Sequence, residues 1–106
     1  MAVYFDFDRG VSFRHPSDLM AILERARQVG ATRATVTGMR GAHRLSDGSL
    51  LQESPDIGRR RAEEIANLLE GAGLTVPLSV DWQDGAAEAD GIDDWQSRRV
   101  TVVLAP

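Results

Sequence analysis

Apolar residues alternate with polar or aromatic ones at the start of the chain. Val3, Phe5 and Phe7 point to one face of residues 3–8, and the residues between them point to the other. A period of two is typical of a half-buried strand. We therefore expect a first strand over Val3–Asp8.

The spacing then changes to that of a helix. Leu19, Ile22, Leu23 and Ala26 recur at intervals of three and four, which places them on one face of a helix. The helix is expected to open at Pro16-Ser17-Asp18, with Ser17 as N-cap, and to stop at Gly30.

A second helix start lies at Ser54-Pro55-Asp56, where a serine N-cap precedes a proline at the first helical position. This helix is expected to end at Gly71 or Gly73. Its apolar positions predict a buried face made of Ile57, Ala62, Ile65, Leu68 and Leu69.

Three further apolar runs predict strands over residues 34–38, 74–82 and 98–104. Residues 39–55 and 84–94 show no periodicity and are expected to be loops. The element order is then β-α-β-α-β-β. We expect a single α/β domain over residues 1–106, a two-layer sandwich with a mixed four-stranded sheet and two helices on one face.

Composition narrows the function classes. The net charge of -4 argues against a nucleic-acid binder, which needs a basic face. The chain has no cysteine, so thiolate chemistry and zinc-thiolate sites are excluded. No apolar run is long enough to span a membrane, and any membrane attachment would come from parts of a parent protein that precede residue 1.

Enzyme chemistry has little support in the sequence. His15 and His43 are the only histidines and lie outside any metal or hydrolase motif. The acidic residues of 84–94 lack the spacing of a calcium loop and predict a solvated loop. We therefore expect no catalytic site, metal or cofactor.

Arginines and tryptophans leave alternatives open. Residues 59–61 place three arginines in the first turns of a helix, where the dipole disfavours cations. They serve either a ligand or ion pairs with Asp56, Glu63 or Glu64. Trp82 and Trp95 either pack the acidic loop or form a platform for a sugar.

Four segments together resemble the OmpA-like family, and in particular its peptidoglycan-associated lipoprotein branch. They are the opening strand Val3-Tyr4-Phe5-Asp6-Phe7-Asp8-Arg9, the second strand Val36-Thr37-Gly38, the helix Ile57-Gly58-Arg59-Arg60-Arg61-Ala62-Glu63-Glu64-Ile65, and the closing Ser97-Arg98-Arg99-Val100. The resemblance spans nearly the whole chain. It implies a periplasmic, non-catalytic module that binds peptidoglycan through the diaminopimelate of the peptide stem.

The resemblance also implies which residues bind. Arg61 falls on the family's carboxylate-binding arginine, and Arg98 or Arg99 on a second basic position. The family's acid and asparagine are replaced here by Gly41 and Ser54.

An acid that could substitute for the missing one is Asp47, in the enlarged loop after the second strand. The first hypothesis is therefore a peptidoglycan module with Arg61, Asp47, Ser54, Arg98 and Arg99 at the ligand. The alternative is a degenerate OmpA-like domain that has lost this ligand and serves as a structural or protein-docking part of an envelope assembly for secretion, conjugation or motility.

Overall fold

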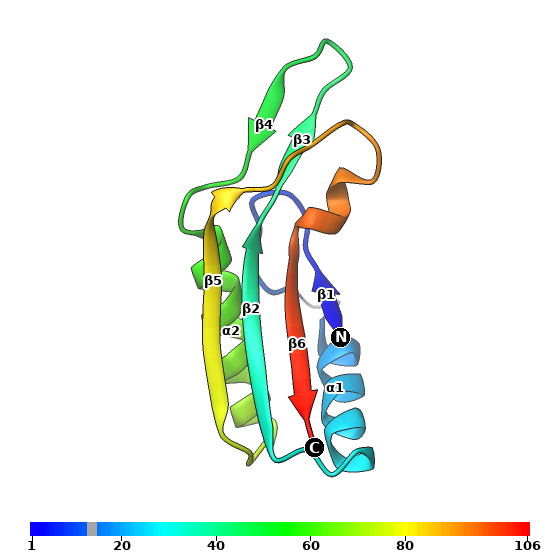
Figure 1. The fold of residues 1–106 in the computed structure, drawn as a ribbon, viewed down its shortest axis with the longest axis vertical. Coiled ribbons are helices and arrows are strands. Elements are labelled where there is room, and N and C mark those ends of the chain that lie inside the picture. The colour runs from blue at the N-terminus through cyan, green and yellow to red at the C-terminus, as the bar shows by residue number, and fades with distance from the viewer. Residues whose placement is uncertain (13–14) are drawn as a thin grey trace.

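A four-stranded sheet in the order β1-β6-β2-β5 forms one layer of the computed structural model, which describes residues 1–12 and 15–106 (Figure 1). β2 runs parallel to β5, and the β1-β6 and β6-β2 pairs are antiparallel, so the sheet is mixed as expected. The elements are β1 (Ala2–Tyr4), α1 (Pro16–Gln28), β2 (Arg33–Arg40), β3 (Ala42–Arg44), β4 (Leu50–Gln52), α2 (Ile57–Gly71), β5 (Leu78–Ala86), the 3-10 helix η1 (Asp94–Ser97) and β6 (Arg99–Ala105).

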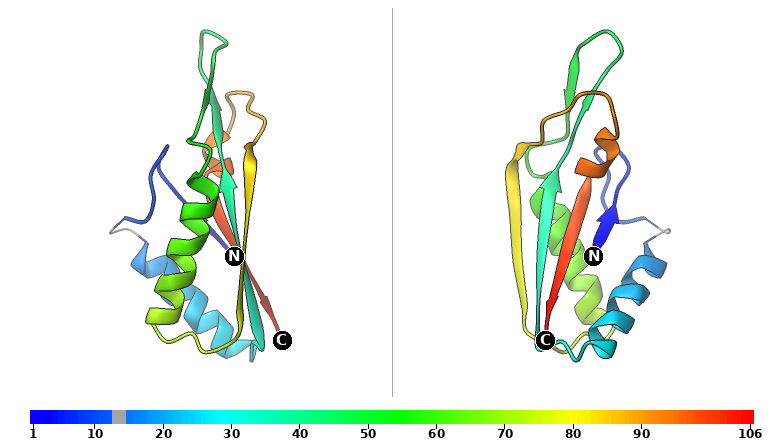
Figure 2. Two further views of the ribbon diagram at one scale, coloured as in Figure 1. Left: turned by 90° about the vertical axis from the view of Figure 1, so that its left-hand side faces the viewer. Right: turned by 45° about the vertical axis from the view of Figure 1, so that its right-hand side comes forward.

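Both α-helices lie on the same face of this sheet, which confirms the predicted two-layer sandwich (Figure 2). α2 packs against β2 and β5, where a parallel pair of strands needs a helical crossover. In the described part of the chain, neither helix is long and apolar enough to cross a membrane.

The core lies between the helices and the sheet. The strand expected over Val3–Asp8 is shorter, because β1 ends at Tyr4 and the chain then turns, but Val3 and Phe5 are buried as predicted. The predicted buried faces of both helices are confirmed for most positions, although Leu68 is exposed. The core residues are Val3, Phe5, Leu19, Ile22, Val36, Ala62, Ile65, Leu69, Val100 and Val102.

The predicted serine N-caps are wrong at both helices. His15 is the N-cap of α1 and Asp56 that of α2, and neither cap makes a side-chain hydrogen bond to its helix. His15 is instead buried with its ring fully engaged: Nδ1 accepts from the Ser12 N–H at 2.8 Å, and Nε2 lies 2.8 Å from the Tyr4 carbonyl oxygen. This histidine fixes the connection from β1 into α1.

The prediction of a loop over residues 39–55 is also wrong, because this segment contains a β-hairpin. β3 and β4 pair antiparallel as a separate two-stranded sheet. The hairpin projects beyond the end of the main sheet and lengthens the molecule to 47 Å against 22 Å in the other directions (Figure 1). Strands of three residues are too short to show a period of two.

The strand expected over residues 74–82 starts later, at Leu78. Residues 72–77 are needed to leave α2 and turn, with Gly73 at φ 111° and the Pro77 carbonyl accepting from Ala34. Proline has no N–H to donate, so the ladder begins after it. β5 then continues to Ala86, which shortens the expected acidic loop from its N-terminal side.

α2 approaches β2 most closely where two glycines face each other. A Cβ added at Gly38 would lie 1.8 Å from the carbonyl oxygen of Gly58 and 3.0 Å from the Cβ of Ala62. Both obstacles belong to the first turns of α2, and the nearer one is backbone that cannot rotate away. The absence of a side chain at Gly38 therefore sets the distance between the helix and the sheet.

We expect Gly38→Ala to destabilise the domain by about 3 kcal/mol, at the upper end for overpacking, because helix and strand must separate. Urea denaturation followed by circular dichroism measures the change. Gly71→Ala is the matched control, since a Cβ there meets nothing within 4 Å and alanine favours a helix. Equal stabilities of the two variants would contradict the proposed close approach.

Candidate functional site

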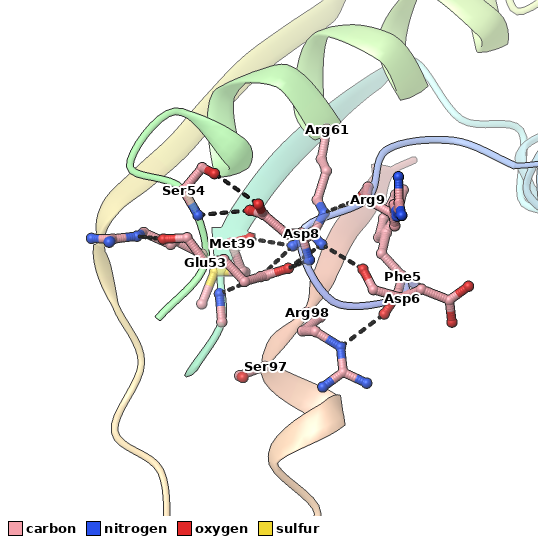
Figure 3. A network of polar contacts seen from close by, with 12 residues as sticks. Phe5, Asp6, Asp8, Arg9, Met39, Glu53, Ser54, Arg61, Ser97 and Arg98 are labelled. Carbon is pink, nitrogen blue, oxygen red and sulfur yellow. Dashed lines mark hydrogen bonds and ion pairs between the residues drawn. The ribbon is translucent and has the colours of Figure 1, made fainter. Parts of the chain in front are cut away.

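The guanidinium of Arg61 is buried at the start of α2 and uses all its donors (Figure 3). Nε donates to the carbonyl of Arg9 at 3.0 Å. Nη1 donates to the Met39 carbonyl at 3.3 Å and to Glu53 Oε1 at 2.6 Å, and Nη2 to the Asp6 carbonyl at 3.1 Å and to Glu53 Oε2. A guanidinium has five N–H donors, and these five bonds occupy them.

Glu53 is the second half of this buried pair and is also fully enclosed. Besides Arg61, its carboxylate accepts the backbone N–H groups of Asp8 and Gly41, each at 2.7 Å. Its own carbonyl accepts from Arg40 Nε at 2.6 Å. Each carboxylate oxygen thus receives one charged donor and one backbone donor, so neither charge is left unpaired.

The chain after β1 is shaped to fit this pair. It turns through Asp8, which has a positive φ of 56°, and the Arg9 N–H closes the turn on the Asp6 carbonyl at 3.1 Å. Phe5 places its ring under the Arg61 guanidinium, 4.8 Å from centroid to Cζ. Such stacking suits arginine, whose planar cation is weakly hydrated.

Gly41 stands where the resemblance led us to expect an acid. Because it has no side chain, it leaves the space that the Arg61–Glu53 pair fills. A Cβ at Gly41 would lie 2.9 Å from Glu53 Oε1, 2.9 Å from Ser97 Oγ and 2.7 Å from Arg98 Cγ. An aspartate at this position has no room while Glu53 is in place. The glycine and the buried glutamate are therefore two parts of one arrangement.

Ser54 does not contact Arg61 and bonds instead to Asp8. Its backbone N–H and its hydroxyl donate to the two carboxylate oxygens of Asp8 at 2.7 and 2.9 Å. These two bonds, the backbone one first, lower the pKa of Asp8 below its ordinary value. The contact ties the end of the hairpin segment to the turn after β1.

Asp47 lies in the turn of the β3–β4 hairpin and does not supply the acid expected beside Arg61. Its carboxylate accepts the backbone N–H of Ser49 at 2.9 Å and its hydroxyl at 2.6 Å. These bonds lower the pKa of Asp47, the hydroxyl one most. The acid that does face Arg61 is Glu53.

The two arginines at the start of β6 donate to different backbone carbonyls, and neither is hydrogen-bonded to Arg61. Arg98 donates from Nε to the Phe5 carbonyl at 3.0 Å, and Arg99 from Nη1 to the Gln96 carbonyl at 3.3 Å. Of the five residues expected at a ligand, the structure thus brings none of the others into hydrogen-bonding contact with Arg61.

The remaining arginines of the helix start follow the ion-pair alternative. Arg59 pairs with Glu63 at 2.9 Å, and Arg60 lies 3.9 Å from Asp56. Both pairs are exposed and stabilise the helix only weakly.

The acidic loop contains one buried carboxylate, which corrects the expectation of a wholly solvated loop. Asp94 is 7% exposed and accepts the backbone N–H groups of Arg44, Gly91 and Asp90 at 2.9, 2.9 and 3.1 Å. These bonds, that of Arg44 first, lower the pKa of Asp94 against the opposing effect of burial. The carboxylate therefore stabilises the junction of hairpin and loop at neutral pH and loses this effect as the pH falls through its lowered pKa.

The fold and these contacts define an α/β two-layer sandwich with a buried arginine–glutamate pair at one end of its sheet. The chain matches no protein-family model and no curated protein.

Sequence reasoning missed Glu53, on which the arrangement depends. It lies in a stretch without periodicity, eight positions before Arg61, and its other partners come from distant segments. Two features of the sequence could have indicated a buried acid from elsewhere in the chain. Arg61 lies near the N-terminal end of a helix, where the dipole disfavours a cation, and Gly41 stands where the resemblance led us to expect an acid.

We expect Arg61→Met to destabilise the domain by about 3–5 kcal/mol, because it leaves the carboxylate of Glu53 buried without its partner. Arg60→Met is the matched control and should change stability by less than about 0.5 kcal/mol, since Arg60 is exposed. Denaturant titration of both variants measures the difference. Equal losses would show that the buried pair does not hold the fold together.

Proposed function

We propose that this chain is a non-catalytic cell-envelope module of the OmpA-like type in which the family's ligand site is filled from within. It then serves as a structural or protein-docking part of an envelope assembly. The observation that supports this role is that Glu53 takes both terminal nitrogens of Arg61, the atoms that would grip a ligand carboxylate. The envelope setting rests on the resemblance of the four sequence segments.

Competition between Glu53 and a ligand decides the binding energy. A carboxylate that reached Arg61 would have to displace Glu53, which would also lose its bonds from Asp8 and Gly41. Each charge-assisted hydrogen bond contributes about 1.5–3 kcal/mol. Because about 1.4 kcal/mol is a factor of ten, losing even one bond without replacement weakens binding tenfold or more.

The hairpin supports the docking role. β4 exposes Leu50 and Leu51, at 38% and 46%, on opposite faces of the hairpin, so that each face offers one apolar side chain to a partner. Arg44, the last residue of β3 before the hairpin turn, donates its backbone N–H to Asp94 and its Nε–H to the Ala89 carbonyl, which ties the hairpin to the loop after β5. An exposed apolar strand tied to the domain in this way is typical of a recognition element.

We expect meso-diaminopimelate to leave the NMR signals of Arg61 Nε–H, Gly41 and Asp8 unchanged at millimolar concentrations, because Glu53 already occupies the guanidinium. A ¹H–¹⁵N titration of the wild-type chain measures this. Arg59→Ala is the control for unspecific attraction of the ligand to exposed arginines.

Saturable shifts at Arg61 and Gly41 that persist in Arg59→Ala would overturn the proposal and favour the diaminopimelate-binding alternative. Glu53→Ala extends the test, because it frees two donors of Arg61. Provided that its spectrum remains folded, this variant should gain affinity relative to the wild type.

A further inference from the structure

A cleft of about 380 Å³ lies beside β1 and borders the Arg61–Glu53 pair, because Phe5 and Asp6 contact Arg61 and also line the cleft. Its walls come from β1, from the start of α1 and from η1. The volume is within the range of small-molecule sites. Besides Phe5 and Asp6, the cleft is lined by Tyr4, His15, Asp18, Trp95 and Arg98.

Two aromatic side chains form one wall. Tyr4 and Trp95 meet edge to face, with ring centroids 4.9 Å apart and planes at 65°. They remain 39% and 44% exposed, although burial of aromatic rings is strongly favourable. The edge-to-face contact orients the two rings relative to each other, and part of each ring surface remains exposed in the cleft.

Arg98 supplies hydrogen-bond donors. Its Nε is fixed by the Phe5 carbonyl at 3.0 Å. Its two terminal nitrogens have no hydrogen-bond partner among residues 1–12 and 15–106, and Figure 3 shows them turned away from the Arg61–Glu53 pair. The head group is thus oriented by one bond while four N–H donors stay available.

Acceptors come from two carboxylates that line the cleft. Asp18 lies in the first turn of α1 and is exposed, and Asp6 follows β1. His15 takes no part, since both its ring nitrogens are engaged with Ser12 and Tyr4. The cleft therefore combines a cation that only donates with carboxylates that only accept.

These groups select a ligand class. A simple anion would be repelled by the two carboxylates, and a simple cation would be repelled by Arg98. Hydroxyl groups both donate and accept, so a neutral polyol satisfies both kinds of group. The open aromatic surface adds a preference for a ring with an apolar face.

We propose that this cleft binds a neutral pyranose sugar, with its ring on Tyr4 and Trp95 and its hydroxyls on Arg98 and Asp18. The site goes beyond the docking role proposed above and does not depend on it. It borders the Arg61–Glu53 pair through Phe5, whose ring stacks on the Arg61 guanidinium, but neither Arg61 nor Glu53 lines the cleft.

Titration of the full chain with cellobiose, followed by ¹H–¹⁵N NMR, tests the proposal. We expect saturable shifts of the Trp95 indole N–H and of backbone signals at Tyr4 and Arg98. Trp95→Ala should abolish them, and Arg98→Met should weaken binding about tenfold or more. Trp82→Ala is the matched control: Trp82 is similarly exposed, at 37%, but lies on β5 at the opposite edge of the sheet, so binding should persist.

Two small molecules separate the alternatives. Sorbitol has the hydroxyls without the ring, and glycine has both charges without the hydroxyls. The proposal is overturned by an absence of shifts with cellobiose, by equal shifts with sorbitol, or by glycine shifting Arg98 while cellobiose does not. It is also overturned if Trp82→Ala, with a folded spectrum, abolishes binding.

Discussion

The guanidinium of Arg61 joins segments that local structure alone would not hold together. It binds the turn after β1 through the carbonyls of Asp6 and Arg9, the end of β2 through Met39, and the residue after β4 through Glu53. Its own backbone belongs to α2. Replacing a buried ion pair by apolar side chains of similar volume often leaves the stability of a protein unchanged or raises it. Here such an exchange would also leave buried carbonyls and N–H groups without partners, so the pair is needed as a whole.

The same contact connects fold and function. Gly41 is the residue that lets Glu53 approach, and Glu53 is the residue that closes Arg61 to an external carboxylate. The hairpin carries Glu53 to its place directly after β4. The hairpin, the glycine at position 41 and the buried arginine are therefore parts of one packing arrangement.

The elements that the sequence predicted best are the two helices, because their apolar residues recur over several helical turns. The two-layer sandwich, the buried faces of both helices and the stop of α1 at Gly30 followed from apolar spacing and from glycine. The hairpin and the helix caps did not, because three-residue strands have no detectable period and Ser54 is used by Asp8. Glu53 and Asp94 are defined by partners far along the chain, which no local pattern encodes.

Side-chain NMR of Arg61 tests the central claim most directly, because it observes the guanidinium itself. A buried group with five fixed acceptors should give separate, slowly exchanging Nη–H signals, with contacts to the Phe5 ring and to Gly41. A single averaged Nη signal that exchanges rapidly with water, as for a solvent-exposed arginine, would contradict the account. The site would then be open to an external ligand, and Glu53 would not be its permanent occupant.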